Sequence, residues 1–203
     1  MKRTQESGIQ FTVGIDEAGR GPLAGPVAVA AVIIFSPKTL RHLKNIKDSK
    51  QLTPKSREKW FEKAQALKAH GILNFSVSFT SEKMIDSRGI VFGIRSSLAR
   101  SLKNICKNPL SVHILLDGGL RAPHNYPSQE TIIRGDETVS IISLASIIAK
   151  VCRDRKMVRC AQKYPAYGFE QHKGYGTRMH YERIKKYGIC PLHRKSFLKN
   201  ILC

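Results

Sequence analysis

The apolar and polar positions of the chain divide it into alternating strand-like and helix-like segments. Residues 11–15 and 27–35 are apolar runs that predict strands, and the second is apolar on both faces, as in a central strand. Thr53 followed by Pro54 predicts the start of a helix that extends to about residue 70. The same periodicities predict further strands at residues 72–79, 112–116 and 132–133, and further helices at residues 90–104, 138–163 and 177–187. Because strands and helices alternate, we expect an α/β fold with a mixed sheet flanked by helices.

The chain shows no internal repeat and no low-complexity linker, so one main domain is expected. We place it at residues 1–163, with a small basic helical region at residues 164–203 packed on it, although residues 1–203 can also count as one domain. The longest apolar run is far too short to cross a bilayer, and residues 1–10 are polar rather than signal-like. Five scattered cysteines without a zinc-binding spacing indicate reduced thiols. We therefore expect a cytoplasmic monomer without membrane contact.

The charge of the chain is strongly positive. Its 203 residues include 35 lysines and arginines against 15 aspartates and glutamates, which gives a net charge of +20. Residues 150–203 alone hold 14 of the basic residues and 3 of the acidic ones. This excess favours a polyanionic partner, and the glycines and tyrosines interleaved with it favour nucleic acid. A basic surface that is merely solvated is the alternative.

Four acidic residues lie where predicted strands end or a predicted helix begins. They are Asp16 and Glu17 after the first predicted strand, Asp117 after a later one, and Asp136 before the long helix. Like charges about 4 Å apart repel by roughly 1–4 kcal/mol, so a cluster of these acids needs a cation. Carboxylate oxygens select hard ions such as Mg²⁺ or Mn²⁺, and two such ions suit phosphodiester hydrolysis. Taken singly, each acid could instead serve a turn or a helix cap.

The glycine-rich segment at residues 19–25 does not match a nucleotide-binding loop. Its glycines are spaced GxGxxxG, and Pro22 removes an N–H group that a phosphate cradle would use. That spacing argues against a dinucleotide fingerprint, and the absence of a following GK[ST] excludes a P-loop. Gly19 and Gly21 instead allow main-chain groups to approach a sugar-phosphate, while Arg20 can grip a phosphate. A tight structural turn is the alternative.

Two further segments contain groups suited to nucleic acid. Residues 172–177 combine basic side chains, including Lys173, with glycines around Tyr175. A tyrosine in that setting can stack on a sugar or a base, although a buried core tyrosine is the alternative. Lys50, in the run at residues 48–52, could contact a phosphate, or its segment could simply lead into the following helix.

Five motifs, taken in order, resemble those of the type 2 ribonuclease H family, and of its ribonuclease HII branch in particular. They are GIDEAGRGPLAGP at residues 14–26, DSKQL at residues 48–52, LLDGG at residues 115–119, GDETVSIISLASIIAKVCRDR at residues 135–155 and YPAYGFEQHKGYGT at residues 164–177. Together they span most of the chain. The related ribonuclease HIII usually has lysine in place of Arg20 and a separate N-terminal domain, so the resemblance favours ribonuclease HII.

The resemblance implies a ribonuclease H-like fold with a small C-terminal helical region. It also implies cutting of the RNA strand in RNA–DNA hybrids, and at single ribonucleotides embedded in duplex DNA, to leave 3′-hydroxyl and 5′-phosphate ends. The four acids would then be both catalytic residues and ligands of two Mg²⁺ or Mn²⁺ ions: Asp16, Glu17, Asp117 and Asp136.

The resemblance also implies how substrate is recognised. In the family, the loop that matches Gly19, Arg20 and Gly21 senses the 2′-hydroxyl at an RNA–DNA junction. The tyrosine that matches Tyr175 stacks on the neighbouring deoxyribose. We expect these residues, together with Lys50 and Lys173, to bind the substrate.

Two other functions remain open from the sequence. A non-catalytic basic binding protein, such as a ribosome-associated factor, would explain the charge but not the four acids at element ends. A metal-dependent nuclease that cuts DNA on the same fold is the other, and Arg20 between glycines and the motif around Tyr175 argue against it.

Overall fold

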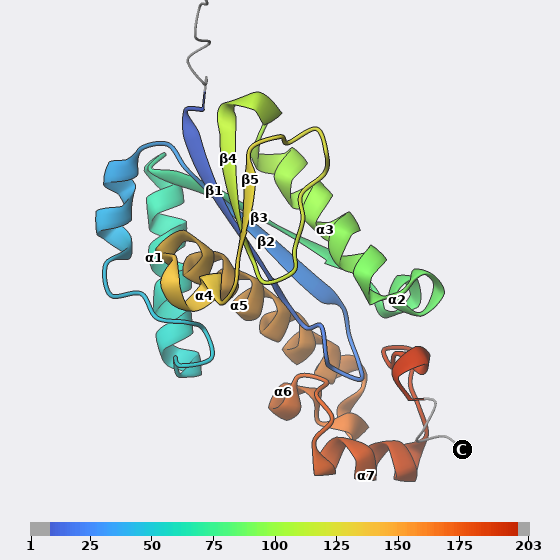
Figure 1. The fold of residues 1–203 in the computed structure, drawn as a ribbon. Coiled ribbons are helices and arrows are strands. Elements are labelled where there is room, and N and C mark those ends of the chain that lie inside the picture. Colours follow the sequence, from blue (N-terminus) through green and yellow to red (C-terminus); the bar gives the residue numbers. More distant parts are fainter. Residues whose placement is uncertain (1–8, 199–203) are drawn as a thin grey trace, which may run out of the picture.

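A computed structural model describes residues 9–198 and contains a five-stranded sheet with the strand order β3-β2-β1-β4-β5 (Figure 1). Its strands are β1 Phe11–Ala18, β2 Val27–Ile34, β3 Leu73–Thr80, β4 Val112–Asp117 and β5 Gln129–Ile132. β1 pairs with β2 and β2 with β3 in antiparallel fashion, whereas β1, β4 and β5 run parallel to one another. The predicted α/β class with a mixed sheet is therefore confirmed.

Helices cover both faces of this sheet. They are α1 Pro54–Ala69, α2 Glu82–Arg88, α3 Ile90–Ile105, α4 Gly135–Thr138, α5 Ser140–Lys163, α6 Phe169–His172 and α7 Arg178–Tyr187. α3 packs on one face, and α1 and α5 pack on the other (Figure 1). β2 is buried along its whole length, in agreement with its apolar sequence, because it contributes alternate side chains to both cores.

The close contact between β1 and α5 determines where the site can form. A Cβ atom at Gly14 would lie 2.6 Å from the carbonyl oxygen of Ile141, so only glycine allows α5 to approach this strand so closely. Val13 and Ile15 point to the α3 face of the sheet. Because side chains alternate along a strand, Asp16 points to the same face as Gly14, toward α5.

The region after α5 lies beyond one end of the sheet, at the bottom of Figure 1. It joins the main body through the loop between β1 and β2, where Ala24 forms an isolated bridge with His193 and the Leu23 N–H group donates to the Gly174 carbonyl. The predicted helical region at residues 164–203 is thus observed up to residue 198, and its last residues, including Cys203, lie outside the described part. Its separation from residues 1–163 as a distinct unit stays a prediction.

The structure corrects several predicted boundaries. β1 does not end at residue 15 but continues to Ala18, because Asp16 and Glu17 pair with Ala30 and Val29 of β2. Asp136 does not directly precede the long helix, since it belongs to the short α4. The last strand, β5, is Gln129–Ile132 rather than residues 132–133, because its register is set by β4. α2 was not predicted.

Two further features of the described residues are their lack of a membrane-spanning helix and the state of their cysteines. Between residues 9 and 198, no helix combines the length and apolar character that a bilayer span requires. The four cysteines in this part are free thiols: Cys106, Cys152, Cys160 and Cys190.

Candidate active site

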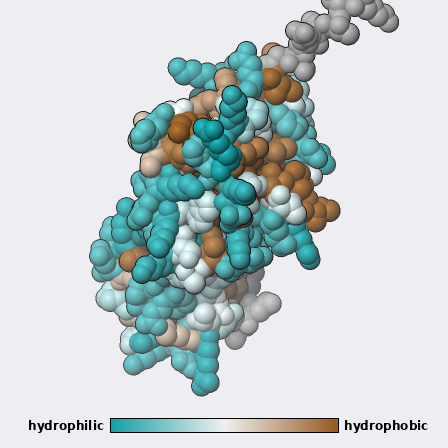
Figure 2. All heavy atoms as spheres, turned by 90° about the vertical axis from the view of Figure 1, so that its left-hand side faces the viewer, coloured by the Kyte–Doolittle hydropathy of each residue, from teal (hydrophilic) through white to brown (hydrophobic). Residues whose placement is uncertain are grey.

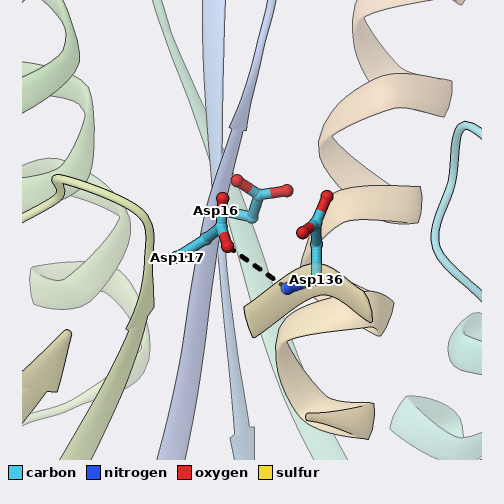
Figure 3. Close-up of side chains that lie close together, drawn as sticks. All are labelled: Asp16, Asp117 and Asp136. Atoms are coloured by element: carbon cyan, nitrogen blue, oxygen red, sulfur yellow. Dashed lines mark hydrogen bonds between the residues drawn. The ribbon is translucent and has the colours of Figure 1, made fainter. Parts of the chain in front are cut away.

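Three of the four predicted acids converge at one edge of the sheet. Asp16, Asp117 and Asp136 each offer a carboxylate oxygen, and these oxygens lie within 4.8 Å of one another (Figure 3). Asp16 and Asp117 come together because β1 and β4 are parallel neighbours and pair Ile15 with Leu116. The main-chain N–H group of Asp136 donates to Asp117 Oδ1 at 3.2 Å, which fixes α4 beside the strands. We call these three residues the acid trio.

Burial makes the acid trio electrostatically unfavourable without a cation. Asp16 and Asp136 are only 5% and 3% exposed. Burial, together with the neighbouring charge of Glu17, raises the pKa of Asp16 well above its usual value. Burial also raises the pKa of Asp117. An oxygen-only donor set that is buried and mutually repulsive fits a hard divalent cation, and it is the one such cluster among residues 9–198.

Glu17 lies beside the acid trio without joining it. Adjacent residues of a strand point to opposite faces, so Glu17 cannot point in the same direction as Asp16. Its Oε1 lies 3.5 Å from Arg20 Nη1, and burial raises its pKa while the charge of Arg20 opposes the rise. Glu17 nevertheless lines the same cavity as the acid trio. Its predicted role as a metal ligand stays a prediction.

The loop that contains Lys50 contacts the acid trio directly. Lys50 Nζ lies 3.0 Å from Asp136 Oδ2, so this lysine is part of the site rather than a lead-in to the helix. The hydroxyl groups of Ser49 and Ser146 lie 2.9 Å apart and connect the loop to α5. Arg57 of α1 donates to the Ser49 and Leu52 carbonyls at 2.8 and 2.6 Å and holds the loop in place. Neither Ser146 nor Arg57 was predicted from the sequence as a site residue.

A cavity of about 270 Å³ brings most of the predicted site residues together. Its lining includes the four acids, the predicted recognition residues and Lys50: Asp16, Glu17, Asp117, Asp136, Gly19, Arg20, Gly21, Lys50 and Tyr175. Residues as far apart in the sequence as Asp16 and Tyr175 thus share one hollow.

Tyr175 is not a core tyrosine. Its side chain is 39% exposed, and its ring lies 5.2 Å from Lys150 Nζ. The ring therefore has a free surface at the edge of the cavity, as stacking requires. Lys173 is placed differently, because its amino group donates to the Glu170 carbonyl and the residue lines a neighbouring groove rather than the cavity of the acids.

The neighbouring groove is larger, about 800 Å³, and its lining has a basic excess, with five lysines and arginines against Glu58 and Asp154. Arg57, Lys150 and Tyr175 line both hollows. The groove adds Arg155 and Arg159 of α5. Figure 2, which shows the side of the molecule that includes α1, is dominated by hydrophilic side chains. The cavity of the acids therefore borders a surface suited to a phosphate backbone.

Three buried histidines support the segment that contains Tyr175. His172 stacks on His180 with ring centroids 4.3 Å apart, and Nε2 of His180 lies 3.1 Å from Nε2 of His193. His180 Nδ1 lies 2.9 Å from the Tyr175 carbonyl oxygen. Burial lowers the pKa of all three, that of His180 to about 4, so the cluster is neutral at pH 7. No local pattern in the sequence indicated this cluster.

Known proteins provide an independent comparison. Ribonuclease HII of Caldicellulosiruptor bescii is 45% identical over 96% of this chain and 90% of that protein, and that of Ruminiclostridium cellulolyticum is 43% identical over 96% and 72%. The ribonuclease HII in a solved complex with PCNA from Archaeoglobus fulgidus is 27% identical, with a TM-score of 0.71 over 91% of this chain and 93% of that one. A solved Bst-RNase HIII in complex with Mn²⁺ shares the fold at 17% identity, with a TM-score of 0.62 over 95% of this chain and 66% of that one.

The sequence model of one family covers nearly the whole chain. The model described as ribonuclease HII matches residues 13–200, a range that contains the acid trio, the glycine turn and Tyr175. The fold, the buried acids and the similarity to curated relatives agree with that match. The chain belongs to the ribonuclease HII family and is a ribonuclease H-type endoribonuclease.

Proposed function

We propose that this protein hydrolyses the RNA strand of RNA–DNA hybrids and also cuts at single ribonucleotides embedded in duplex DNA. One observation carries the proposal. The acid trio, whose carboxylate oxygens lie within 4.8 Å of one another, lines the same cavity as the Gly19–Gly21 turn and Tyr175. One hollow thus combines groups for phosphodiester chemistry with groups that can inspect the sugar. A binding protein without activity would have no use for three buried, mutually repulsive carboxylates.

The cations we propose are Mg²⁺ or Mn²⁺, held by the acid trio with Glu17 alongside. When bound, two such ions supply a water-derived nucleophile and neutralise charge on the scissile phosphate. The chain itself holds the carboxylates in position: β1 and β4 fix Asp16 and Asp117, and the N–H group of Asp136 ties α4 to Asp117. Lys50, at the rim of the cavity, is placed to contact a phosphate oxygen.

Recognition of the ribonucleotide depends on the 2′-hydroxyl, which can both donate and accept a hydrogen bond. In the described part of the chain, the main-chain N–H groups of Arg20 and Gly21 have no protein acceptor, and both residues line the cavity. We propose that these groups face the ribose, while the Tyr175 ring stacks on the adjoining deoxyribose. A ring with a free face is suited to that contact.

The proposed products are a 5′-phosphate and a 3′-hydroxyl. Water that attacks phosphorus opposite the 3′ oxygen displaces that oxygen and leaves these ends. Attack by the substrate's own 2′-hydroxyl would instead leave a 2′,3′-cyclic phosphate and a 5′-hydroxyl. Product analysis therefore tests whether the nucleophile is water, as a site of metal-binding carboxylates requires.

The proposed setting is the cytoplasm, with the protein as a monomer. The four cysteines in the described residues are free thiols, which supports a reducing compartment.

The test uses three duplexes of one sequence: all DNA, DNA with one ribonucleotide, and a uniform RNA–DNA hybrid. Each is incubated with the protein and Mg²⁺ or Mn²⁺, or with a chelator. We expect cutting of the second and third duplexes, only with metal, at the ribonucleotides. Normal binding without cutting would favour a binding protein, and equal cutting of the all-DNA duplex would favour a DNA nuclease.

A further inference from the structure

Two arginines are completely buried next to the turn between β1 and β2. Arg153 of α5 and Arg194 of the C-terminal region are both 0% exposed. Among residues 9–198, neither forms an ion pair with a carboxylate. Their guanidinium groups donate instead to main-chain carbonyl oxygens, which help to compensate the two buried charges.

Arg194 closes the turn from inside. Its Nη2 donates to the Gly19 carbonyl at 2.7 Å, its Nη1 to the Arg20 carbonyl at 2.9 Å, and its Nε to the Gly25 carbonyl at 2.9 Å. A single rigid guanidinium thus fixes the beginning and the end of the turn relative to each other. The planar fork of arginine suits this task, whereas the single ammonium of lysine cannot hold all three oxygens in that geometry.

The contacts of Arg194 also determine what the turn presents to the cavity. A trans peptide is planar, and its N–H group points away from its carbonyl oxygen. Because the Gly19 and Arg20 carbonyls face Arg194, the N–H groups of Arg20 and Gly21 in the same two peptides point away from it. These are the two N–H groups that have no protein acceptor in the described part of the chain.

Arg153 connects the same turn to the segment that contains Tyr175. Its Nε donates to the Pro26 carbonyl at 2.8 Å and its Nη2 to the Ala24 carbonyl at 3.1 Å, while its Nη1 donates to the Lys173 carbonyl at 3.0 Å. The guanidinium carbon lies 5.6 Å from the centre of the Tyr175 ring. Arg153 packs so closely on the turn that a Cβ atom at Gly19 would lie 2.0 Å from its Nε.

We propose that Arg153 and Arg194 are positioning residues that determine how well the protein distinguishes a ribonucleotide from a deoxyribonucleotide. Arg194 orients the free N–H groups of the turn, and Arg153 fixes the distance between that turn and Tyr175. Neither arginine contacts the substrate. The inference rests on the proposed function, because the turn and Tyr175 are the groups that read the sugar there.

The alternative is that both arginines only attach the C-terminal region to the sheet. The two possibilities differ in the ratio of rates on two substrates, since a purely structural defect lowers both rates together. A single ribonucleotide offers one 2′-hydroxyl in one register, so its cutting depends on exact placement of the reading groups. A uniform hybrid offers a 2′-hydroxyl at every position and tolerates misplacement better.

The test compares Arg153→Lys and Arg194→Lys with the wild-type chain and with Arg100→Lys, an exposed arginine, as a control. Arg100 also donates to a main-chain carbonyl, that of Phe79 at 2.6 Å, but it belongs to α3 on the opposite face of the sheet. Single-turnover rates are measured on the single-ribonucleotide duplex and on the uniform hybrid, at a temperature where circular dichroism shows every variant folded.

We expect the rate ratio, single ribonucleotide over hybrid, to fall about tenfold in both site variants, the loss expected for one or two misaligned hydrogen bonds. The ratio should not change in Arg100→Lys. The same site substitutions made together with Asp16→Asn, which prevents cutting, should reduce the preference of binding for the ribonucleotide-containing duplex over the all-DNA duplex.

An unchanged ratio in the site variants, whatever their absolute rates, would overturn the inference. If a lysine variant does not fold, Arg153→Gln or Arg194→Gln replaces it, and loss of folding in both forms would assign the arginines to the fold alone. Failure of the wild-type chain to cut either duplex is a separate result, which would overturn the proposed function itself.

Discussion

Lys50 and Asp136 form an ion pair at the rim of the cavity, with Nζ 3.0 Å from Oδ2, and connect segments 86 residues apart. The Lys50 side chain is 78% exposed, whereas that of Asp136 is 5% exposed. The hydrogen bond to Asp136 raises the pKa of Lys50. The exposed Lys50 side chain thus partly neutralises the buried Asp136, and a metal ion at Asp136 or a phosphate at Lys50 would compete with this ion pair.

Replacement of Lys50 by methionine should show separately how Lys50 affects phosphate binding and how it affects metal binding. Loss of the cation should weaken duplex binding and reduce the slope of log K against log salt by about 1, as for one phosphate contact. Mn²⁺ should bind up to about fivefold tighter, because an exposed ion pair contributes at most ~1 kcal/mol. Calorimetry with Mn²⁺ and a salt series of duplex binding would measure both effects.

Lys47→Met is the matched control, since Lys47 is an exposed lysine on the same loop. An unchanged salt slope in Lys50→Met would remove Lys50 from the phosphate-binding residues.

Replacement of Asp16 by asparagine should abolish cutting at every metal concentration. The amide keeps the shape of the side chain but cannot supply the anionic oxygen that the cation requires. Duplex binding should stay equal or become tighter, since a charge that repels phosphate is removed. Normal turnover by this variant would rule out the acid trio as the metal site.

The metal-free Asp16→Asn protein should also be more stable than the wild type at pH 7. Burial raises the pKa of Asp16 in the folded state. As the pH rises, the unfolded chain therefore releases this proton at a lower pH than the folded chain does. The free energy of unfolding of the wild type falls over that pH range, because the folded state holds a proton that the unfolded state has released. The stability advantage of the variant should therefore vanish near pH 4 and grow toward pH 7. Each kcal/mol of removed penalty corresponds to about 2–4 °C in melting temperature.

Melting curves at several pH values, with and without Mn²⁺, test this expectation. Mn²⁺ should stabilise the wild type at pH 7 by mass action and leave Asp16→Asn unaffected. A wild type that melts at the same temperature with and without Mn²⁺ would contradict the proposed site.

Replacement of Tyr175 by alanine should reduce cutting at a single ribonucleotide far more than cutting of a uniform hybrid. Tyr175 is partly exposed, and loss of one stacking contact costs about 1–3 kcal/mol, or roughly fivefold to 150-fold. Tyr175→Phe keeps the ring and should retain most of the activity. Equal losses on both substrates would mean that the ring is structural.

The sequence predicted much of the sheet, because apolar runs bounded by turns identify strands directly. It could not show that β1 extends through Asp16 and Glu17, since that extension depends on pairing with Ala28, Val29 and Ala30 of β2. Two acids in a row look like the end of a strand. α2 was missed although Ser81 caps it, because only two turns separate that cap from Gly89.

The acid trio could be predicted because carboxylates are scarce in this chain and these three stand near the ends of elements that the sequence predicts. The burial of Arg153 and Arg194 could not be predicted. In a chain with a net charge of +20, nothing in the sequence distinguishes a buried arginine from the many exposed ones. Only the tertiary structure shows that the partners of Arg153 and Arg194 are carbonyl oxygens distant in sequence. The three buried histidines were also missed, because only the tertiary structure brings their rings together.

The hydrogen bond between Arg194 and Gly19 joins residues 175 positions apart. Closing so long a loop costs chain entropy. The hydrogen bonds between β1 and β2, in contrast, join residues that are close in sequence. The main-chain pairing of β1 with β2 can therefore form without Arg194, whereas the shape of the turn between them depends on it. Detachment of the C-terminal region would therefore remove the Arg194 contacts that shape the turn without breaking the β1–β2 hydrogen bonds beside it.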